Sequence, residues 1–422
     1  MGRGSGDQDL RARVRAAVER HVVPVAREAD VNRTFLRAPL EALAKEGLVG
    51  APIPRDYGGQ GMTNEESVVI YEEVGRVCAA TRGFLAVQVG LVAQCILDWG
   101  TEVQKRRWLP RLCSLDAIGC YAVTEPEAGS DVAAVKTSAF RNRLTGEKWW
   151  ITNGTQADVA IVLARTGDDR HKGLTAFLVT DLRAERMADP ELGHRGADHA
   201  ILRFKETPGE VLGGEGKGFD VAMSGLDHGR LGVAAGAVGI HAACLDECVA
   251  FARDRRQFGK RVGDFQLVQG DLADLACELE ASRLLCQEAA RRQDAKDPHA
   301  RRFTSMAKLY CTEAAARAAG KALVLLGARG YNNRMPVERH YRDIKGLEIY
   351  EGTSHIQRMI IGRDLVGPDE KRPPRPPQEL LDPAPPPISF RQRPDDTEPF
   401  VPPLEDIRTS KPRPPKPPPT KG

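Results

Sequence analysis

The sequence predicts an α+β fold that is mainly α, with helices in the first and last thirds of the folded region and strands between them. Apolar residues recur every three or four positions up to about residue 119, short β-branched and aromatic runs follow over 120–225, and helical spacing returns over 226–366. With 422 residues, 41% of them apolar, the chain can bury a large core. We expect three domains, 1–119, 120–225 and 226–366, and a Pro-rich tail over 367–422.

The first domain is expected to be helical. Apolar residues fall at helical spacing in "LRARVRAAVERHVV", and the same spacing in "APLEALAKEGLVG" closes on a glycine, which commonly ends a helix. A turn-rich stretch, "PIPRDYGGQGMTNEE", then leads into another helix.

The second domain is expected to be a small β domain, because "KWWITNG", "VAIVLART" and "LTAFLVTDL" are short runs of strand-forming residues. It opens with "CYAVTEPEAGSDVAAVKT", in which an apolar strand breaks into a loop. The backbone N–H groups and small hydroxyls of such a loop suit a planar heterocycle or a phosphate, although an ordinary turn has the same pattern. A tryptophan in "GEKWWITNG" is either the wall of a flat ring or a buried strand residue.

The third domain returns to long helical patterns. The stretch "LDHGRLGVAAGAVGIHAACLDECVAFARDRR" is rich in Gly and Ala and predicts close contact between helices, and four leucines of a later helix fit one apolar stripe: Leu267, Leu272, Leu275 and Leu279. Near its end, in "EIYEGTSHIQRMIIGRD", Glu351 precedes an apolar helix. This residue is either an acid stabilised by the helix dipole or a buried general base. The Pro-rich tail is expected to be disordered or polyproline II.

Composition limits the partners and the compartment. The net charge of +3 gives no strong field toward nucleic acid, and no uninterrupted apolar run approaches the length of a membrane span. The start, "MGRGSGDQDLRARVR", lacks the apolar stretch of a secretory signal, so we expect a cytoplasmic protein. The nine cysteines contain no CxxC pair, so reduced thiols are expected and no metal site is.

Four motifs occur in one order: TEPEAGSD, WITNG, "RRQFGKRVGDFQ" and "RGYNNRMPVERHYRDIKGLEIYEGTSHIQR". In these motifs the chain resembles the acyl-CoA dehydrogenase family from about residue 8 to residue 366. The resemblance implies an N-terminal helical domain, a middle β-barrel and a C-terminal four-helix bundle. It also implies FAD held between barrel and bundle in a homotetramer.

The same resemblance assigns the site residues. It places at FAD the residues Tyr121, Val123, Thr124, Gly129, Ser130, Trp150, Ile151, Thr152, Gly327, Thr353 and His355. The FAD of a neighbouring subunit is reached by Arg255, Gln257, Phe258 and Gln266. The acyl thioester is contacted by Arg82, Ser130, Asp227, Arg230, Gly352 and Arg363, with Asp227 and Arg230 on the pantetheine arm.

Glu351 matches the catalytic base of the family. A carboxylate in a dry pocket can remove the weakly acidic α-proton of a thioester, because burial raises the pKa of the base. A second lineage carries its base beside the arginine of "LDHGR", where this chain has Gly229, so Glu351 has no competitor there. Three residues depart from the family pattern: Val324 and Ala328 replace residues of the FAD diphosphate segment, and His355 stands where Gln or Glu is common.

The leading function is therefore FAD-dependent α,β-dehydrogenation of a short acyl thioester, carried by CoA or by an acyl carrier protein, with electron-transfer flavoprotein or another acceptor. Arg82 also resembles an arginine of the glutaryl-CoA type that binds a distal carboxylate, which gives oxidation with or without decarboxylation as an alternative. Nitroalkane oxidation is disfavoured, because those relatives carry Asp in place of Glu351. A DNA-associated flavoprotein of the alkylation-response branch is the alternative of another class, but the prolines and acids of the tail disfavour it.

Overall fold

The computed structural model describes residues 5–367, so the Pro-rich tail predicted over 367–422 lies almost entirely outside the described residues. The predicted helices of the first segment are confirmed, and they are α1 (Ser5–His21), α2 (Val23–Asn32), α3 (Arg37–Lys45), η1 (Arg55–Tyr57), α4 (Asn64–Val77), α5 (Ala79–Leu85), the π-helical η2 (Ala86–Ala93), α6 (Gln94–Trp99) and α7 (Glu102–Ser114). Capping boxes explain where two of them begin. Thr63 pairs with Glu66 at α4, and Thr101 pairs with Gln104 at α7.

The middle segment forms an eight-stranded sheet, which follows the order β6-β7-β3-β2-β4-β5-β8 and adds β1 parallel to β4. Its strands are β1 (Gly119–Ala122), β2 (Ser138–Phe140), β3 (Arg143–Thr152), β4 (Val159–Arg165), β5 (Leu174–Val179), β6 (Arg183–Arg186), β7 (His199–Pro208) and β8 (Glu210–Leu212), with the short helix η3 (Val132–Ala134) after β1. Strands β4 and β5 are buried almost throughout, which explains their continuous apolar runs.

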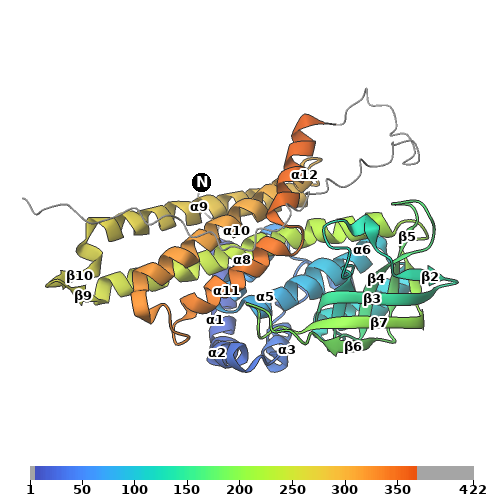
Figure 1. The fold of residues 1–422 in the computed structure, drawn as a ribbon, viewed down its shortest axis with the longest axis horizontal. Helices are drawn as coiled ribbons and strands as arrows, with labels where there is room; N and C mark the ends of the chain where they lie inside the picture. The colour runs from blue at the N-terminus through green and yellow to red at the C-terminus, as the bar shows by residue number, and fades with distance from the viewer. Residues whose placement is uncertain (1–4, 368–422) are drawn as a thin grey trace, which may run out of the picture. The chain divides into compact units, whose positions relative to one another are not determined.

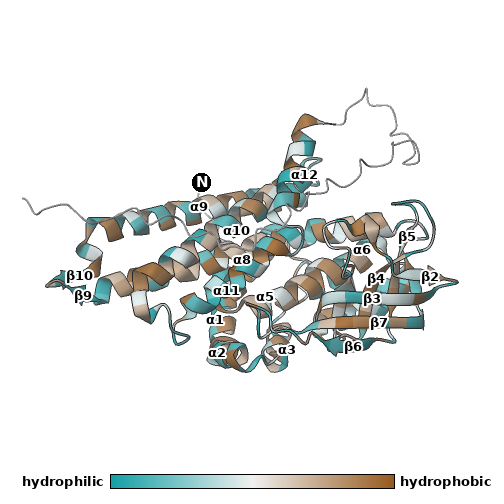
Figure 2. Ribbon diagram, viewed as in Figure 1, coloured by the Kyte–Doolittle hydropathy of each residue, from teal (hydrophilic) through white to brown (hydrophobic). Residues whose placement is uncertain are grey.

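The last segment is helical. It comprises α8 (Gly218–Asp254), the hairpin of β9 (Arg256–Gln257) and β10 (Lys260–Arg261), η4 (Val262–Asp264), α9 (Gln266–Asp294), α10 (Ala300–Leu326), η5 (Gly327–Arg329), α11 (Pro336–Ile349) and α12 (Ser354–Val366). The hairpin lies at one end of α8 and α9, while the strands lie toward the other end of α8 (Figure 1). Figure 2 shows the hairpin in hydrophilic colour. The mainly helical class with a β middle segment is therefore as predicted, while the domain boundaries stay predictions.

Small residues let α8 cross α4 closely, as the Gly and Ala content of α8 predicts. A Cβ on Gly239 would lie 2.1 Å from the Glu72 carbonyl oxygen, and one on Gly75 would lie 2.9 Å from Gly236 Cα. The predicted leucine stripe of α9 is only partly right. Leu275 and Leu279 are buried, whereas Leu267 is 87% exposed, since no described element covers the first turn of α9.

Two helical stretches of the described residues, Ala79–Trp99 and Gly218–Asp254, are long and apolar enough to cross a membrane by length and composition alone. Their most apolar windows are 78% and 72% buried inside the protein, and core helices meet the same criteria. All nine cysteines are free, and all but Cys277 are buried.

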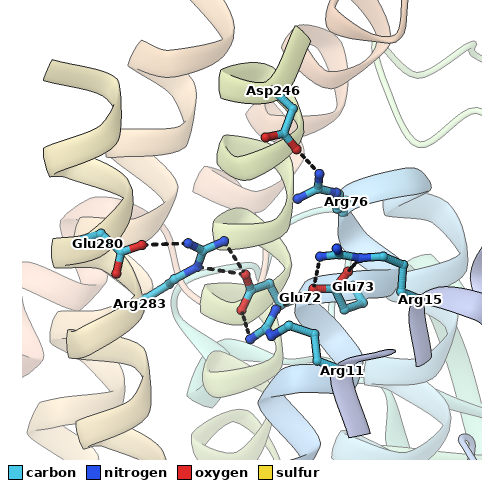
Figure 3. A network of polar contacts seen from close by, with 8 residues as sticks. All are labelled: Arg11, Arg15, Glu72, Glu73, Arg76, Asp246, Glu280 and Arg283. Carbon is cyan, nitrogen blue, oxygen red and sulfur yellow. Dashed lines mark hydrogen bonds and ion pairs between the residues drawn. The ribbon is translucent and has the colours of Figure 1, made fainter. Parts of the chain in front are cut away.

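A network of ion pairs joins the first segment to the last. It links α1, α4, α8 and α9 through the residues drawn in Figure 3, which are Arg11, Arg15, Glu72, Glu73, Arg76, Asp246, Glu280 and Arg283. Glu73 is buried and accepts hydrogen bonds from Arg11 and, at 3.0 Å, from Arg15. Burial raises its pKa, but the two arginines outweigh burial and the net pKa of Glu73 is lowered.

Replacing Glu73 by Gln should therefore destabilise the protein in a pH-dependent way. The pKa of Glu73 is lower in the folded protein than in the unfolded chain, where it is about 4.5. Its ionised form therefore stabilises the fold fully above pH 4.5, and this stabilisation is lost as the pH falls through the pKa of the folded state. We expect Glu73→Gln to lower the free energy of unfolding by about 1–3 kcal/mol at pH 7 and by progressively less below pH 4.5. Urea denaturation at several pH values measures this.

The control is Glu41→Gln, which breaks the exposed Arg37–Glu41 pair on α3 and should cost less than about 0.5 kcal/mol. A constant cost of Glu73→Gln from pH 7 to pH 3 would contradict the assigned ionic contribution.

Candidate active site

Glu351 lies in the short turn between α11 and α12. Its backbone is left-handed, with φ +56°, and Gly352 follows at φ +89°. A left-handed conformation is uncommon for a residue with a side chain and persists only when its surroundings hold it. Lys308 Nζ donates to the carbonyl oxygens of Gly352 at 2.8 Å and Glu348 at 3.2 Å, and Gln357 Nε2 donates to those of Glu351 at 3.1 Å and Gly352 at 2.9 Å. Two buried side chains thus fix the turn.

Glu351 as a whole residue is partly exposed, but its carboxylate is buried. Its Oε2 is inaccessible to solvent and has no hydrogen-bond partner among residues 5–367. Burial raises the pKa of Glu351 to about 7, although the positive charges of Arg82, Lys308 and Arg230 work against the increase. Both protonation states of this carboxyl are therefore accessible near neutral pH, which suits a group that takes up and releases a proton.

Gly229 provides the space for that carboxylate. A Cβ at position 229 would lie 1.9 Å from Glu351 Oε2 and 2.5 Å from its Cδ, closer than atoms can approach. Gly229 stands where a second lineage of the family carries its base. In this chain it is instead the point on α8 against which the Glu351 carboxylate packs. Gly90 on η2 is close as well, since a Cβ there would lie 3.9 Å from Gly229 Cα.

Arg82 is buried beside this carboxylate, with only 1% of the residue exposed. It makes no ion pair within 4 Å in residues 5–367, and its Nη2 donates to the Tyr350 hydroxyl. Its Nε and Nη1 are buried and have no hydrogen-bond partner in the part of the chain that the structure describes. A Cβ on Gly236 would lie 2.6 Å from Nε. Arg82 therefore neither points to solvent nor pairs with a protein acid.

Asp227 and Arg230 lie on one face of α8, as their three-residue spacing predicts, and they form an ion pair with each other. Asp227 also lies 3.4 Å from Arg301. Arg230 is buried, and its Nε has no partner in the described residues. Burial lowers the pKa of Arg230. Their contact with pantetheine stays a prediction.

The loop after β1 is held by a buried ion pair. Lys148 Nζ lies 2.7 Å from Glu125 Oε1 and also donates to the Val123 carbonyl oxygen at 2.9 Å. Glu125 in turn accepts from the backbone N–H groups of Lys136 and Thr137. Burial lowers the pKa of Lys148 to about 8. The ion pair fixes the backbone that leads to the exposed end of the loop.

The predicted flavin residues of this loop differ in exposure. Gly129 and Ser130 are exposed, Thr124 is half-buried, and Val123 is buried. Tyr121 is also buried, and its hydroxyl donates to the Ala222 carbonyl oxygen of α8 at 3.0 Å. Its hydroxyl therefore joins the sheet to α8.

Trp150 lies in a β-bulge. The pairing of β3 with β7 shifts register between Lys148 and Ile151, and Trp150 has φ +61° and is 50% exposed. Ile151 is buried in the sheet core, and Thr152 is half-buried opposite His199. The bulge turns the tryptophan ring out of the sheet, which contradicts a buried strand residue at this position.

Several predicted residues lie far from Glu351 in one chain. Arg255, Gln257, Phe258 and Gln266 are all exposed, on or next to the β9–β10 hairpin. The hairpin follows the last residue of α8, a 37-residue helix about 55 Å long whose first residue packs on Thr175 of β5. Gly327 directly follows α10, whose last residue, Leu326, lies 18 residues and about 27 Å beyond Lys308 along the helix. The described chain therefore does not bring these residues to Glu351.

The remaining predicted residues belong to the Glu351 turn or to α12. Thr353 caps α12, with its Oγ1 accepting from the Ile356 N–H at 3.3 Å, while His355 and Arg363 are exposed on that helix. Sequence reasoning missed Lys308, although a lysine within the apolar pattern "TSMAKLYC" was a signal for a buried charge. It also missed Tyr350, which carries no such signal.

Three family models match the chain in the order of its three segments. The N-terminal, middle and C-terminal domains of acyl-CoA dehydrogenase match residues 5–116, 120–207 and 216–366. The chain belongs to the acyl-CoA dehydrogenase family. The resemblance read from the sequence motifs and the fold that it implied are thereby confirmed. The family is FAD-dependent, and the protein is an oxidoreductase of the acyl-CoA dehydrogenase type.

Individual relatives agree. The chain is 39% identical over 371 residues to the short-chain specific mitochondrial acyl-CoA dehydrogenase of Sus scrofa, covering 85% of this chain and 90% of the relative. Butyryl-CoA dehydrogenase from Megasphaera elsdenii matches with a TM-score of 0.84 and 32% identity over 87% of this chain and 100% of that one. A glutaryl-CoA dehydrogenase in complex with glutaryl-CoA matches with a TM-score of 0.82 and 34% identity over 87% and 96%.

The glycine contact gives a direct test of the site. Gly229→Ala should lower kcat/KM at least about 100-fold, because the new methyl group must displace the Glu351 carboxylate. Folding stability should not fall for backbone reasons, since Ala is the better helix former by about 1 kcal/mol. Steady-state kinetics and a thermal melt measure the two effects.

Gly232→Ala on the same helix is the matched control. Its added Cβ would lie 3.6 Å from Ala86 and Tyr71, which is ordinary contact, so kcat/KM should stay within about threefold. If kcat/KM falls equally in both variants, α8 tolerates no alanine in this region. The effect of Gly229→Ala could then not be attributed to displacement of the Glu351 carboxylate.

Proposed function

We propose that this protein removes hydrogen across the α,β bond of a short acyl thioester, with Glu351 as the base. The observation that carries the proposal is the buried and unbonded Glu351 Oε2, whose pKa is raised to about 7. A thioester α-proton is weakly acidic, so a base that is poorly solvated and near neutral pKa is effective. The similarity to short-chain and butyryl-CoA dehydrogenases supports a short acyl chain.

The residues around Glu351 divide the work. Lys308 and Gln357 fix its backbone, and Gly229 leaves the space in which its carboxylate can approach an α-carbon. The positive charges of Arg82, Lys308 and Arg230 keep the carboxyl from becoming too basic to release its proton after the reaction. Asp227 and Arg230 are placed on the α8 face that would follow the pantetheine arm.

The residues present fit FAD. Trp150 offers a half-exposed aromatic face, and Gly129 and Ser130 are exposed. Apart from its two chain neighbours, no described residue has a heavy atom within 4 Å of where a Cβ on Gly129 would be. We assign the ring contacts to Val123, Thr124, Trp150, Ile151 and Thr152, with Tyr121 placing β1, and further contacts to Thr353 and His355. When bound, FAD accepts the β-hydrogen of the substrate as hydride.

A second copy of the chain would complete the cofactor site. Arg255, Gln257, Phe258, Gln266 and Gly327 lie at the end of the helices away from the sheet, which supports our proposal that they contact the FAD of another subunit. The exposed apolar surface there supports an interface, since Phe258 is 92% and Leu267 is 87% exposed. A homotetramer in the cytoplasm, with CoA or carrier-protein thioesters and electron-transfer flavoprotein as acceptor, is the assembly we propose.

A carboxylate-bearing thioester, as in glutaryl-CoA oxidation, is the second candidate. Arg82 keeps two buried guanidinium nitrogens without a partner, which is costly unless a ligand supplies acceptors. The carboxylate of an acyl tail would supply them. We also propose Gly352 and Arg363 as contacts of the thioester. The DNA-associated alternative rested on the Pro-rich tail, which lies outside the described residues, and nothing within them favours it.

Glu351→Gln tests the base. Anaerobic flavin reduction by butyryl-CoA should slow by about 10²- to 10⁴-fold, because the amide cannot accept the α-proton. In the unmodified protein, kcat/KM should rise as the pH increases through about 7, since the free base must be deprotonated. Stopped-flow absorbance at several pH values measures both, and an unchanged rate in Glu351→Gln would refute the assignment.

Arg82→Met tests the substrate class. The ratio of kcat/KM for glutaryl-CoA to that for butyryl-CoA should fall about 10- to 100-fold, as expected for one charge-assisted hydrogen-bond pair. Any change in the pKa of Glu351 affects both substrates and cancels in the ratio. An unchanged ratio would exclude the carboxylate-bearing candidate and leave simple short acyl chains.

A further inference from the structure

The loop between β6 and β7 packs His194 against α11. His194 is buried, its backbone N–H donates to Asp343 Oδ1 at 2.6 Å, and its Nε2 lies 3.0 Å from the Asp343 carbonyl oxygen. A carbonyl oxygen only accepts, so Nε2 carries the proton. A Cβ on the preceding Gly193 would lie 2.5 Å from the Arg342 carbonyl oxygen, so the loop sits directly on the α11 backbone. One hydrogen bond to Asp343 therefore holds the backbone of His194, and a second holds its imidazole.

The fixed imidazole supports the ring of Tyr350. The two rings meet edge to face, with centroids 5.6 Å apart and an angle of 77° between their planes. Gly346 makes room for both, because a Cβ there would lie 2.9 Å from His194 Cδ2 and 3.3 Å from Tyr350 Cε1. Tyr350 immediately precedes Glu351, so its ring position and the catalytic turn are set together.

Tyr350 is also the hydrogen-bond partner of Arg82. Its hydroxyl accepts from Arg82 Nη2, and the guanidinium carbon lies 5.8 Å from the centre of its ring. On the other side, Arg82 packs against Gly236. The other two guanidinium nitrogens, Nε and Nη1, are buried without a hydrogen-bond partner in the described residues. The charge of Arg82 lowers the pKa of Glu351, the residue next to Tyr350, and the charge of Glu351 in turn raises the pKa of Tyr71 and Tyr121.

We infer that His194 is a positioning residue: it holds Tyr350 so that Arg82 keeps its guanidinium beside Glu351 at the acyl end of the site. The inference rests on the proposed function and extends it. It names His194, a residue of the middle segment, as one that affects the pKa of Glu351 on the last segment. Burial, then the charges of Arg82 and His199, lower the pKa of His194 to about 3, so the imidazole is neutral and does not repel Arg82.

The test measures the pKa of the Glu351 carboxyl by following the infrared band of its protonated form as the pH changes. The band is assigned to Glu351 because it should be missing from the Glu351→Gln variant. This readout needs no turnover, so it tests the link to Arg82 even if Glu351 proved not to be the base. Because Arg82 lowers the pKa of Glu351, moving it away should raise that pKa. We expect His194→Leu, which keeps most of the buried volume, to shift the titration upward by about one pH unit.

The decisive comparison is a double-variant cycle. Arg82→Met should give at least the shift of His194→Leu, and the double variant should shift no further than Arg82→Met alone, because both changes remove the same charge. Tyr350→Phe removes only the accepting hydroxyl and should shift the titration in the same direction. It also carries the test if His194→Leu does not fold.

His340→Ala is the matched control. His340 is a second buried histidine, lies on α11 itself, and its ring nitrogens have no hydrogen-bond partner in the described residues. This change should lower the melting temperature without moving the Glu351 titration. If His194→Leu also lowers only the melting temperature, or if its shift adds to that of Arg82→Met, the positioning role is refuted.

Discussion

The site depends on one buried carboxylate that the fold leaves without a hydrogen bond. Glu351 Oε2 is enclosed and unpaired, and its residue has a left-handed backbone. Neither feature is favourable on its own, so both need support from neighbouring elements. Lys308 and Gln357 fix the turn, and Gly229 on α8 gives the carboxylate its space. The folded state thus maintains a buried carboxyl whose pKa is near neutral.

The charges around this carboxylate have a second effect. Arg82, Arg230 and Lys308 come from α5, α8 and α10, and each is buried, so each is attracted to Glu351 in a poorly solvated setting. Burial lowers the pKa of Lys308 to about 8. Desolvation and positive charge therefore oppose each other at Glu351, and the balance decides its pKa. Loss of any one cation should move that balance, which makes the site sensitive to how firmly each is held.

Much of the fold and part of the site could be read from the sequence. Helical and strand periodicity predicted the three segments, and the motif around Glu351 predicted its place in a turn before α12. The three-residue spacing predicted that Asp227 and Arg230 share one helix face, and the two side chains contact each other there. Two limits are physical. First, a stripe of leucines does not show where a helix extends beyond the elements that pack on it, and Leu267 proved to be exposed. Second, the local pattern around Lys308 could not show that its Nζ would reach carbonyl groups 40 and 44 residues away.

The role of a glycine was equally hidden. In the sequence Gly229 marked only the absence of a second base, whereas in three dimensions it is the contact that lets Glu351 occupy the site. His194 and Tyr350 have no motif of their own, because their connection to Arg82 exists only once β6, β7 and α11 are packed together. Residues that act through such contacts are visible only in the folded structure.

The most direct measurement of the central claim is proton exchange without oxidation. In 3,3-dimethylbutyryl-CoA the β-carbon carries no hydrogen, so the α-protons can be removed but no α,β double bond can form. In D₂O the protein should exchange the α-protons of this thioester for deuterium, seen by mass spectrometry, and Glu351→Gln should not. Equal exchange by both proteins would contradict the account.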